Sequence, residues 1–318
     1  MVEDIKQQRD KESRGQRKRR RDKSLRLKIG HGGTLDPMAT GVLIIGIGRG
    51  TKYLTNFLNC TKSYTTTMLF GAATDTYDIL GKVLSRAPYE HVTRAKVEEA
   101  LPTFRGETMQ TPPIYSALKQ DGKKLYEYAR EGKEPPREIQ QRSVTVEKLE
   151  IVEWLDKHDY RWPREDAPEA EKEVAQKVLH LGEVKGSEGE ESADVAPGEK
   201  RKRDHDAASE DEPQPKRQQG EQVEERAANG QEEASSIPPA VSLDMTVTSG
   251  FYVRSLCHDL GKAIDSHGLM AELVRSRQGD YILGQNVFEY DDLSKGEDEW
   301  GPKIRAMLEG WLEKNPVQ

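Results

Sequence analysis

An uninterrupted hydrophobic run, GVLIIGI at residues 41–47, follows a glycine-rich loop, GHGGTLDPMAT at residues 30–40. A run without polar positions is typical of a strand that is buried on both faces. The next segment, GRGTKYLTNFLN, begins with turn residues and continues with apolar positions at helical spacing: Tyr53, Leu54, Phe57 and Leu58. This part of the chain is therefore predicted to run from loop to strand to helix.

A different pattern, with a period of two, marks further strands. In KSYTTTMLFG, at residues 62–71, the side chains at positions 64, 66, 68 and 70 share one face, and β-branched and aromatic residues dominate. Residues 144–152 and 241–247 also read as strands. Directly after the strand at 62–71, TDTYDILG at residues 74–81 has the composition of a turn.

Two helices are predicted outside the first segment. Thr93 is a good N-cap for a short helix over residues 93–101. TSGFYVRSLCHDLGKAI, which follows the strand at 241–247, turns into a helix whose apolar face carries Leu256, Leu260, Ala263 and Ile264. No internal repeat is visible, so the pattern indicates a mixed α/β fold with several strands and few helices.

Composition changes this picture between residues 161 and 240. The whole chain of 318 residues is 34% apolar and 33% charged, with a formal net charge of −7. Residues 161–240 hold 12 Lys/Arg, 21 Asp/Glu and only nine Val, Ile, Leu, Trp, Phe or Tyr. Such a segment buries too little surface to offset the entropy of ordering. We predict a disordered insertion at 161–240 inside a single domain, because ordered sequence resumes at residue 241.

The beginning of the chain is strongly basic. Residues 11–28 alone have a net charge of +8, and residues 1–28 are predicted to be disordered, in contact with RNA, or a nuclear localisation signal. KRKR at 200–203 and PKR at 215–217 suggest a bipartite nuclear signal. The expected compartment is the nucleus or the cytoplasm, with mitochondria as a further destination.

Cysteine usage and hydropathy exclude several classes of protein. Cys60 and Cys257 lie far apart and have no metal-ligand spacing around them, so neither a disulfide framework nor a zinc site is expected. No apolar run approaches the roughly 20 residues of a membrane helix. The N-terminus has no apolar signal-peptide core. A soluble intracellular protein without a metal is therefore expected.

Asp36 is the first residue with potential chemistry, because it stands alone in the glycine-rich loop. A loop aspartate is most often a turn or capping residue. The glycines suggest a phosphate cradle, but the Gly-Lys-Ser/Thr of a P-loop is missing. A pairing of His31 with Asp36 suggests hydrolysis, but no GxSxG or catalytic-cysteine pattern accompanies it. Spacing alone therefore names no reaction.

Several motifs in succession resemble one known family. GHGGTLDPMATGVL is similar to the catalytic motif of the TruB family of tRNA pseudouridine synthases, in the eukaryotic branch that modifies uridine 55. SYTTTMLFGAATDTYDILG resembles the next family motif, and QTPPIYSALKQDGKKLYEYAREGKEPPRE resembles its RNA-binding thumb. SGFYVRSLCHDLG and ELVRSRQG resemble the two C-terminal motifs. These matches cover most of residues 29–160 and 241–290, in family order.

The resemblance implies roles for five residues. Asp36 would be the catalytic aspartate, which attacks the flipped-out uridine or abstracts a sugar proton, and Arg254 would pair with it and hold it ionised. Tyr64 would stack on the target base and assist proton removal from its carbon. His31 would help to hold the flipped-out arrangement, and Leu273 would form an apolar pocket wall, unless it is ordinary helix core. The glycines would let the pocket wall approach the flipped nucleotide, and the isomerisation needs no cofactor.

The thumb, placed at residues 105–138, carries five cations that the resemblance assigns to RNA binding: Lys119, Lys123, Lys124, Arg130 and Arg137. Phosphate contacts by such residues give salt-dependent affinity, and loop shape gives selectivity. The expected partner is the T-stem-loop of tRNA, with mRNA as a further target, and the expected state is a monomer. The fold implied is the pseudouridine synthase fold, a mixed, largely antiparallel sheet flanked by helices with a central catalytic cleft. Its catalytic domain would comprise residues 29–160 and 241–318.

Two departures from the family pattern stand out. Nothing matches the opening strand and KPxGxxS motif about thirty residues before the aspartate loop, so we expect an exposed strand edge and apolar surface there. Residues 291–318 are too short for the C-terminal PUA domain of bacterial members. Two alternatives therefore stay open beside direct tRNA modification. One is a guide-directed or mRNA- or rRNA-modifying synthase, and the other is a non-catalytic chaperone that folds tRNA.

Overall fold

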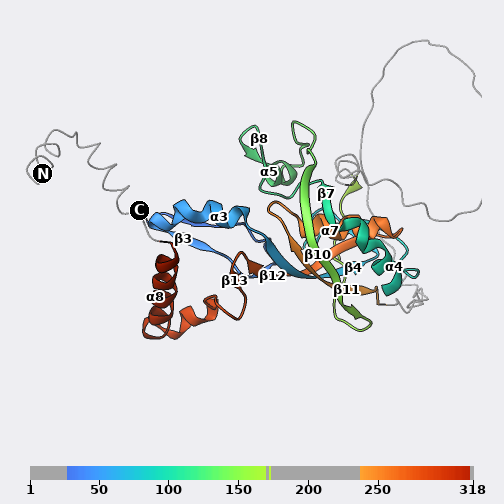
Figure 1. Ribbon diagram of the computed structural model, residues 1–318. Coiled ribbons are helices and arrows are strands. Elements are labelled where there is room, and N and C mark those ends of the chain that lie inside the picture. Colours follow the sequence, from blue (N-terminus) through green and yellow to red (C-terminus); the bar gives the residue numbers. More distant parts are fainter. Residues whose placement is uncertain (1–26, 170–171, 173–236, 316–318) are drawn as a thin grey trace, which may run out of the picture. The chain divides into compact units, whose positions relative to one another are not determined.

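A computed structural model describes residues 27–169, 172 and 237–315 (Figure 1). Three sequence predictions fall mostly or wholly on other residues and lie outside the described part. They are the disordered basic segment at 1–28, the interior of the insertion at 161–240, and the nuclear signal at 200–217.

A seven-stranded sheet forms the centre of the described fold. Its strands follow the order β13 (Tyr281–Ile282), β12 (Gly268–Gln278), β4 (Lys62–Phe70), β11 (Ala240–Val247), β10 (Arg142–Leu155) and β7 (Gly106–Gln110). All of these neighbours are antiparallel, whereas β2 (Thr40–Gly41) joins β12 in parallel. The mixed, largely antiparallel sheet expected from the sequence is therefore confirmed.

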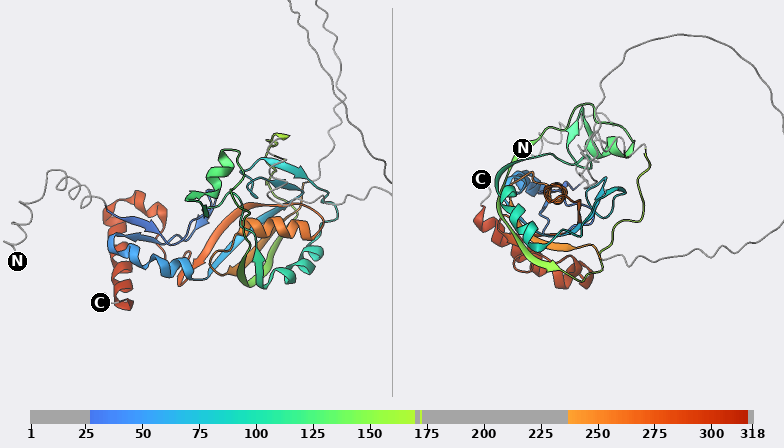
Figure 2. Two further views of the ribbon diagram at one scale, coloured as in Figure 1. Left: turned by 90° about the horizontal axis from the view of Figure 1, so that it is seen from above. Right: turned by 90° about the vertical axis from the view of Figure 1, so that its right-hand side faces the viewer.

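The main hydrophobic core lies between one face of this sheet and two helices, α4 (Arg94–Ala100) and α7 (Val253–Ala263) (Figures 1 and 2). Because side chains alternate along β4, Met68 and Phe70 share the face that meets this core. From α7, Leu256 and Leu260 are almost completely buried, as the helical spacing predicted. The hydroxyl of Thr93 accepts a hydrogen bond from the backbone N–H of Lys96 at 3.3 Å, so the predicted N-cap is confirmed.

The opposite face of the sheet carries a smaller apolar cluster, and here the predicted bounds of the insertion are wrong. Trp162 packs against this cluster and donates its indole N–H to the carbonyl of Phe70 at 2.9 Å. The N–H of Ala167 donates to the carbonyl of Val83 at 2.9 Å, in β6 (Val83–Arg86), which pairs with β5 (Ala72–Thr74). Ala240 is already part of β11. One tryptophan and backbone pairing thus anchor residues that composition assigned to a disordered segment.

The predicted strand at 41–47 is also wrong, because the run divides into two short strands. Gly41 ends β2, and residues 45–47 form β3 (Ile45–Ile47), which pairs with β1 (Ile29–His31) in a separate two-stranded ribbon. The inner face of the ribbon holds glycines against Leu54, in α3 (Leu54–Asn59), which follows η1 (Gly48–Tyr53).

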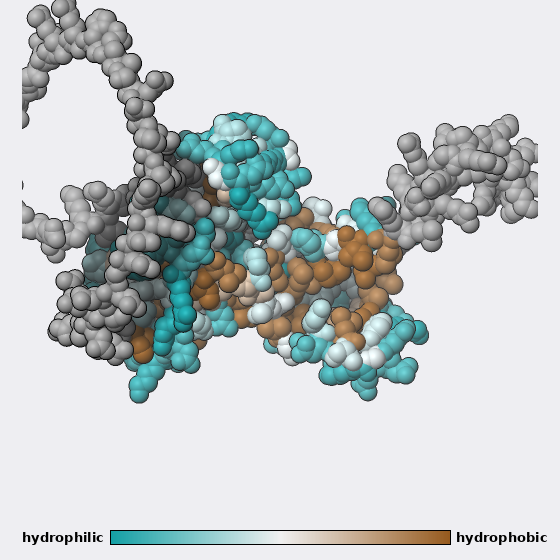
Figure 3. Space-filling model, turned by 180° about the vertical axis from the view of Figure 1, so that it is seen from behind, coloured by the Kyte–Doolittle hydropathy of each residue, from teal (hydrophilic) through white to brown (hydrophobic). Residues whose placement is uncertain are grey.

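The outer face of the ribbon is apolar and exposed. Ile29, Ile45 and Ile47 are exposed by 62%, 51% and 57%, and Figure 3 shows hydrophobic residues gathered on the surface of one end of the molecule. Within the described residues, β1 and β3 pair only with each other. The exposed strand edge and apolar surface expected near the aspartate loop are therefore present.

The predicted thumb begins later than the sequence suggested. Residues 101–104 form η2 (Leu101–Phe104), and 106–110 form β7, an edge strand of the main sheet. The compact unit that carries the cations consists of β8 (Lys119–Gln120), β9 (Lys123–Lys124) and α5 (Leu125–Arg130) (Figure 2). We use the name thumb for residues 119–137 from here on.

The C-terminal part of the described chain contains η3 (Tyr290–Lys295) and α8 (Glu297–Lys314). Trp311 of α8 meets Tyr53 edge to face, with ring centroids 4.9 Å apart, so this helix packs beside the ribbon and α3. None of the helices in the described ranges combines the length and the hydropathy that crossing a bilayer would require.

Candidate active site

Backbone hydrogen bonds join the two ends of the loop that carries Asp36. The N–H of Gly32 donates to the carbonyl of Ile44 at 2.8 Å, and the N–H of Ala39 donates to the carbonyl of Asp36 itself at 2.9 Å. These bonds join the two ends of the loop and fold its tip into a turn, so Asp36 projects from a fixed backbone.

Two glycines of this segment are needed for close packing within the protein rather than for room beside a nucleotide. A Cβ at Gly41 would lie 2.3 Å from the carbonyl oxygen of Arg275, and its φ of +96° disfavours other residues. A Cβ at Gly32 would lie 2.7 Å from Phe57. The resemblance suggested that the glycines make room for the flipped base. At Gly41 and Gly32, however, the space that a side chain would need is occupied by residues of β12 and α3.

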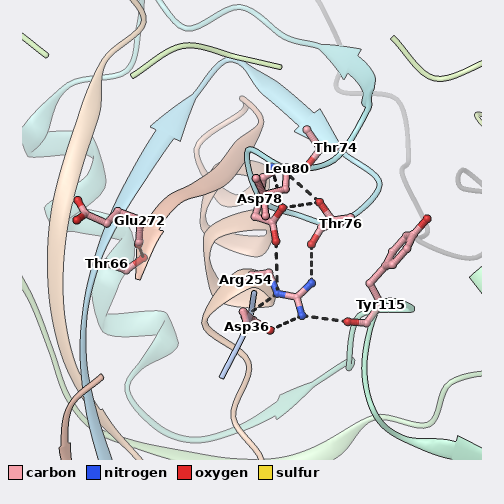
Figure 4. A network of polar contacts seen from close by, with 9 residues as sticks. All are labelled: Asp36, Thr66, Thr74, Thr76, Asp78, Leu80, Tyr115, Arg254 and Glu272. Carbon is pink, nitrogen blue, oxygen red and sulfur yellow. Dashed lines mark hydrogen bonds and ion pairs between the residues drawn. The ribbon is translucent and has the colours of Figure 1, made fainter. Parts of the chain in front are cut away.

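Asp36 makes a two-point ion pair with Arg254 (Figure 4). The guanidinium Nε donates to Oδ2 and Nη2 donates to Oδ1, both at 2.8 Å. Arg254 is almost fully buried near the start of α7, whereas the side chain of Asp36 keeps 24% of its surface exposed. The predicted pairing is therefore present, and its geometry leaves one side of the carboxylate open to a ligand.

The rest of the guanidinium is held by groups that the sequence analysis did not name. Nη1 donates to the carbonyl of Thr76 at 2.9 Å, and Nη2 donates to the carbonyl of Tyr115 at 3.0 Å (Figure 4). A second carboxylate, Asp78, has Oδ2 3.8 Å from Nε of Arg254. Arg254 thus lies between two carboxylates, and its orientation is determined by both.

Asp78 is buried inside the turn at 74–81. Its Oδ1 accepts hydrogen bonds from the hydroxyl of Thr76 at 2.7 Å and from the N–H of Leu80 at 3.0 Å. Burial raises the pKa of Asp78 above its usual value, and the hydrogen bonds and Arg254 act against that shift. The signal was available in the sequence, because TDTYDILG is turn chemistry with an aspartate between apolar positions.

Tyr64 lies on β4, half-buried, at the edge of the main core. It stands directly opposite Arg275 in the pairing of β4 with β12, so the two side chains lie on the same face of the sheet. Burial raises the pKa of the Tyr64 hydroxyl, the Arg275 charge lowers it, and the negative charge of Asp36 raises it further. Tyr64 and Asp36 are therefore close enough to influence each other electrically.

The two remaining residues of the predicted pocket lie in different environments. Leu273 is 4% exposed and belongs to the main core, in strand β12 rather than in a helix, opposite Thr66 of β4. His31 is exposed in β1, opposite Ile45. The structure therefore places Leu273 in the main core, and His31 on the ribbon that leads into the loop.

The five predicted RNA-binding cations all lie in the thumb, and most have partners there. Lys123 pairs with Glu131 and lies over the ring of Tyr128. Lys124 and Arg130 both lie over the ring of Tyr126, at 5.1 and 5.0 Å from its centroid. The two others are Arg137, which pairs with Asp121, and Lys119, which is exposed in β8. Alternating cations and tyrosines thus form one small surface.

The described residues contain no cluster of three or more His, Cys, Asp or Glu side chains suited to a metal ion. The functional groups that the structure brings together around Asp36 are a carboxylate, a guanidinium and a phenol. Such a set suits acid–base or nucleophilic chemistry on a bound base.

Comparison with known proteins identifies the family. Residues 18–163 match the TruB family pseudouridylate synthase (N terminal domain). The tRNA pseudouridine synthase 4 of Schizosaccharomyces pombe is 40% identical over 311 residues, which cover 91% of this chain and 74% of that protein. The chain belongs to the TruB family of pseudouridine synthases. Membership of the TruB family makes it an isomerase, and the buried pair of Asp36 and Arg254 lies in two of the motifs by which the sequence resembles that family.

Two further relatives extend the comparison. The tRNA pseudouridine synthase 4 of Saccharomyces cerevisiae is 37% identical over 300 residues, which cover 92% of this chain and 71% of that protein. The tRNA pseudouridine synthase B of Chromobacterium violaceum is 50% identical over 125 residues, which cover 39% of this chain and 40% of that protein. The resemblance to the TruB family therefore holds for fungal and bacterial members alike.

Proposed function

We propose that this TruB-family chain is a tRNA pseudouridine synthase that converts uridine 55 in the T loop of tRNA to pseudouridine. The observation that carries the proposal is the two-point pair between Asp36 and Arg254, with one side of the carboxylate left exposed. A buried guanidinium bonded to both carboxylate oxygens holds the carboxylate in one orientation.

In the proposed reaction the target uridine is flipped out of its stack toward Asp36. Asp36 either forms a bond to the nucleoside or abstracts a proton from its sugar, and the bond between N1 of uracil and C1′ of ribose breaks. The base turns and a bond forms between C5 and C1′. On the first route the bond to Asp36 then breaks, and on the second route Asp36 returns the proton to the sugar. Finally the proton on C5 is lost, and N1 gains a proton. Atoms and electrons balance within the nucleotide, so the reaction consumes no other reactant.

Tyr64 and the thumb have complementary parts in this proposal. In this proposal the ring of Tyr64 stacks on the base, and its hydroxyl assists removal of the C5 proton. The cations and tyrosines of the thumb provide phosphate contacts and stacking surfaces for a folded RNA. The T-stem-loop is therefore the proposed ligand.

The test is tritium release from a T-stem-loop transcript that contains uridine labelled at C5. The full chain should release tritium, and Asp36→Asn should release none while it binds the transcript within about tenfold of the original affinity, because phosphate contacts dominate binding. Asp166→Asn, an exposed aspartate that pairs with Arg86, is the matched control and should stay active.

Turnover by Asp36→Asn would refute the assigned role of Asp36. Binding without pseudouridine formation by the full chain would instead support the chaperone alternative. Turnover on rRNA or mRNA transcripts but not on the T-stem-loop would support the alternative of a guide-directed or mRNA- or rRNA-modifying synthase.

A further inference from the structure

Arg275 is an unusual residue of this fold, because it is 1% exposed and yet carries a full charge. Among the described residues, its guanidinium forms no ion pair with a carboxylate. A buried cation is costly unless other groups compensate it. The groups that it does contact should therefore explain why it is there.

Two of these contacts are backbone carbonyls at opposite ends of the Asp36 loop. Nε of Arg275 donates to the carbonyl of Val42 at 2.6 Å, and Nη2 donates to the carbonyl of Gly33 at 3.2 Å. The backbone of Arg275 adds a third tie, since its carbonyl accepts the N–H of Val42 at 2.8 Å. One residue of β12 therefore holds the segment before Asp36 and the segment after it.

Tyr64 is the neighbour of Arg275 on the next strand. The pairing of β4 with β12 places the two residues directly opposite each other, so their side chains lie on the same face of the sheet. Arg275 is thus bonded to the loop that carries Asp36 and paired across the strands with Tyr64.

We propose that Arg275 is a positioning residue for catalysis, which fixes the Asp36 loop relative to Tyr64, its cross-strand partner on β4. This inference rests on the proposed function. It deepens that function by explaining how a carboxylate from a loop and a phenol from a strand keep one separation. Displacements of about 1 Å between reacting groups can lower a rate by about 100-fold.

The charge of Arg275 has a second consequence. It favours the ionised form of Tyr64, and thereby opposes the effects of burial and of Asp36, both of which raise the pKa of Tyr64. A tyrosine that takes up a proton from C5 of the base benefits from such a cation beside its oxygen. Arg275 is thus placed to orient Tyr64 and to stabilise negative charge on it.

Gln278 offers a matched comparison within the same strand. Its Nε2 donates to the carbonyl of Gly32 at 2.6 Å and to that of Phe57 at 3.0 Å, so it also holds the Asp36 loop. Its partner across the pairing of β4 with β12 is Lys62 rather than Tyr64. A variant of Gln278 therefore loosens the loop alone, whereas a variant of Arg275 should disturb the loop and Tyr64 together.

The experiment measures single-turnover rates on the T-stem-loop transcript for Arg275→Gln, Arg275→Lys and Gln278→Met, each with and without Tyr64→Phe. Arg275→Gln should lower the rate by about 10- to 100-fold, with less than about a threefold change in transcript affinity, because phosphate contacts lie elsewhere. In the Tyr64→Phe background, Arg275→Gln should lower the rate by less than about a further threefold. For Gln278→Met combined with Tyr64→Phe, the fold-loss in rate should instead equal the product of the two single losses.

The pH profile gives an independent readout. Arg275→Gln should move the limb that reports Tyr64 to higher pH, and Arg275→Lys, which keeps the charge, should leave it nearly in place. If Tyr64→Phe leaves too little rate to measure, this profile decides alone.

Multiplicative losses for Arg275→Gln with Tyr64→Phe, or an unmoved pH limb, would overturn the inference and leave Arg275 as a structural loop contact. Circular dichroism and the thermal midpoint confirm that each variant is folded at the assay temperature. Failure of the unaltered chain to form pseudouridine would refute the proposed function instead, so the two failures are distinguishable.

Discussion

His258 lies one helical turn after Arg254 on α7, and its replacement by Phe gives a quantitative test of the packing behind the site. Its ring stacks on that of Tyr77, with centroids 4.1 Å apart and planes inclined by 14°. Within the described residues, neither of its ring nitrogens has a hydrogen-bond partner. Tyr77 follows Thr76, whose carbonyl holds Arg254, so the stack supports one of the contacts that orient the catalytic pair.

The magnitude of the effect follows from the buried imidazole. Burial, the positive charge of Lys262 and His267 lower the pKa of His258 from 6.5 to about 3. Below about pH 6.5 the imidazole is therefore protonated in the unfolded chain but not in the folded chain. This difference lowers the free energy of unfolding as pH falls from about 6.5 toward 3. Linkage gives a loss of about 1.3 kcal/mol between about pH 7.5 and about pH 5.5.

The assay is urea unfolding at both pH values, followed by tryptophan fluorescence and circular dichroism. His258→Phe keeps an aromatic ring against Tyr77 and removes the titrating group, so the fall in unfolding free energy should shrink by about 1.3 kcal/mol. Leu256→Met, a buried change in the same helix, should leave the pH dependence unchanged. An equally steep fall in His258→Phe would show that the buried imidazole is protonated in the folded chain, and would refute the reasoning.

Two further predictions concern the Asp36 loop and the thumb. Gly41→Ala should lower the unfolding free energy by more than about 1 kcal/mol, because its Cβ would meet the backbone of Arg275 and its φ is positive. Gly284→Ala, with a positive φ but open space around it, isolates the strain in the same urea assay, and equal losses would contradict the predicted clash. Glu131→Gln releases two lysines from ion pairs and should strengthen transcript binding up to about fivefold in a filter-binding assay, since exposed pairs contribute at most about 1 kcal/mol. Glu98→Gln, in α4, is the control, and unchanged or weaker binding by Glu131→Gln would contradict that prediction.

Local patterns predicted most of the regular elements. The alternation in KSYTTTMLF, the N-cap at Thr93 and the apolar face of α7 all describe interactions between neighbours in the sequence, and each element formed as expected. The family motifs also placed Asp36 and Arg254, because a motif preserves the residue types that chemistry requires. These features could be read without knowing how the chain folds back on itself.

Contacts between distant segments decided the rest. GVLIIGI looked like one buried strand, but Gly41 passes against the backbone of β12 and Ile45 joins an exposed ribbon, so its burial depended on partners that hydropathy does not reveal. Trp162 holds residues that composition assigned to a disordered insertion. Arg275 lies in the motif ELVRSRQG, but only the structure shows that it is buried and bonded to the Asp36 loop.

By itself, then, the sequence determined the kinds of elements, the residue types of the site and the family. Only the tertiary structure decided that Arg254 lies between Asp36 and Asp78, and that a buried Arg275 connects the Asp36 loop to Tyr64. Those arrangements join residues more than 170 positions apart in the chain. Spacing in the sequence carries no information about such distances, because they are set by the register of β4 against β12 and by the packing of α7 on the sheet.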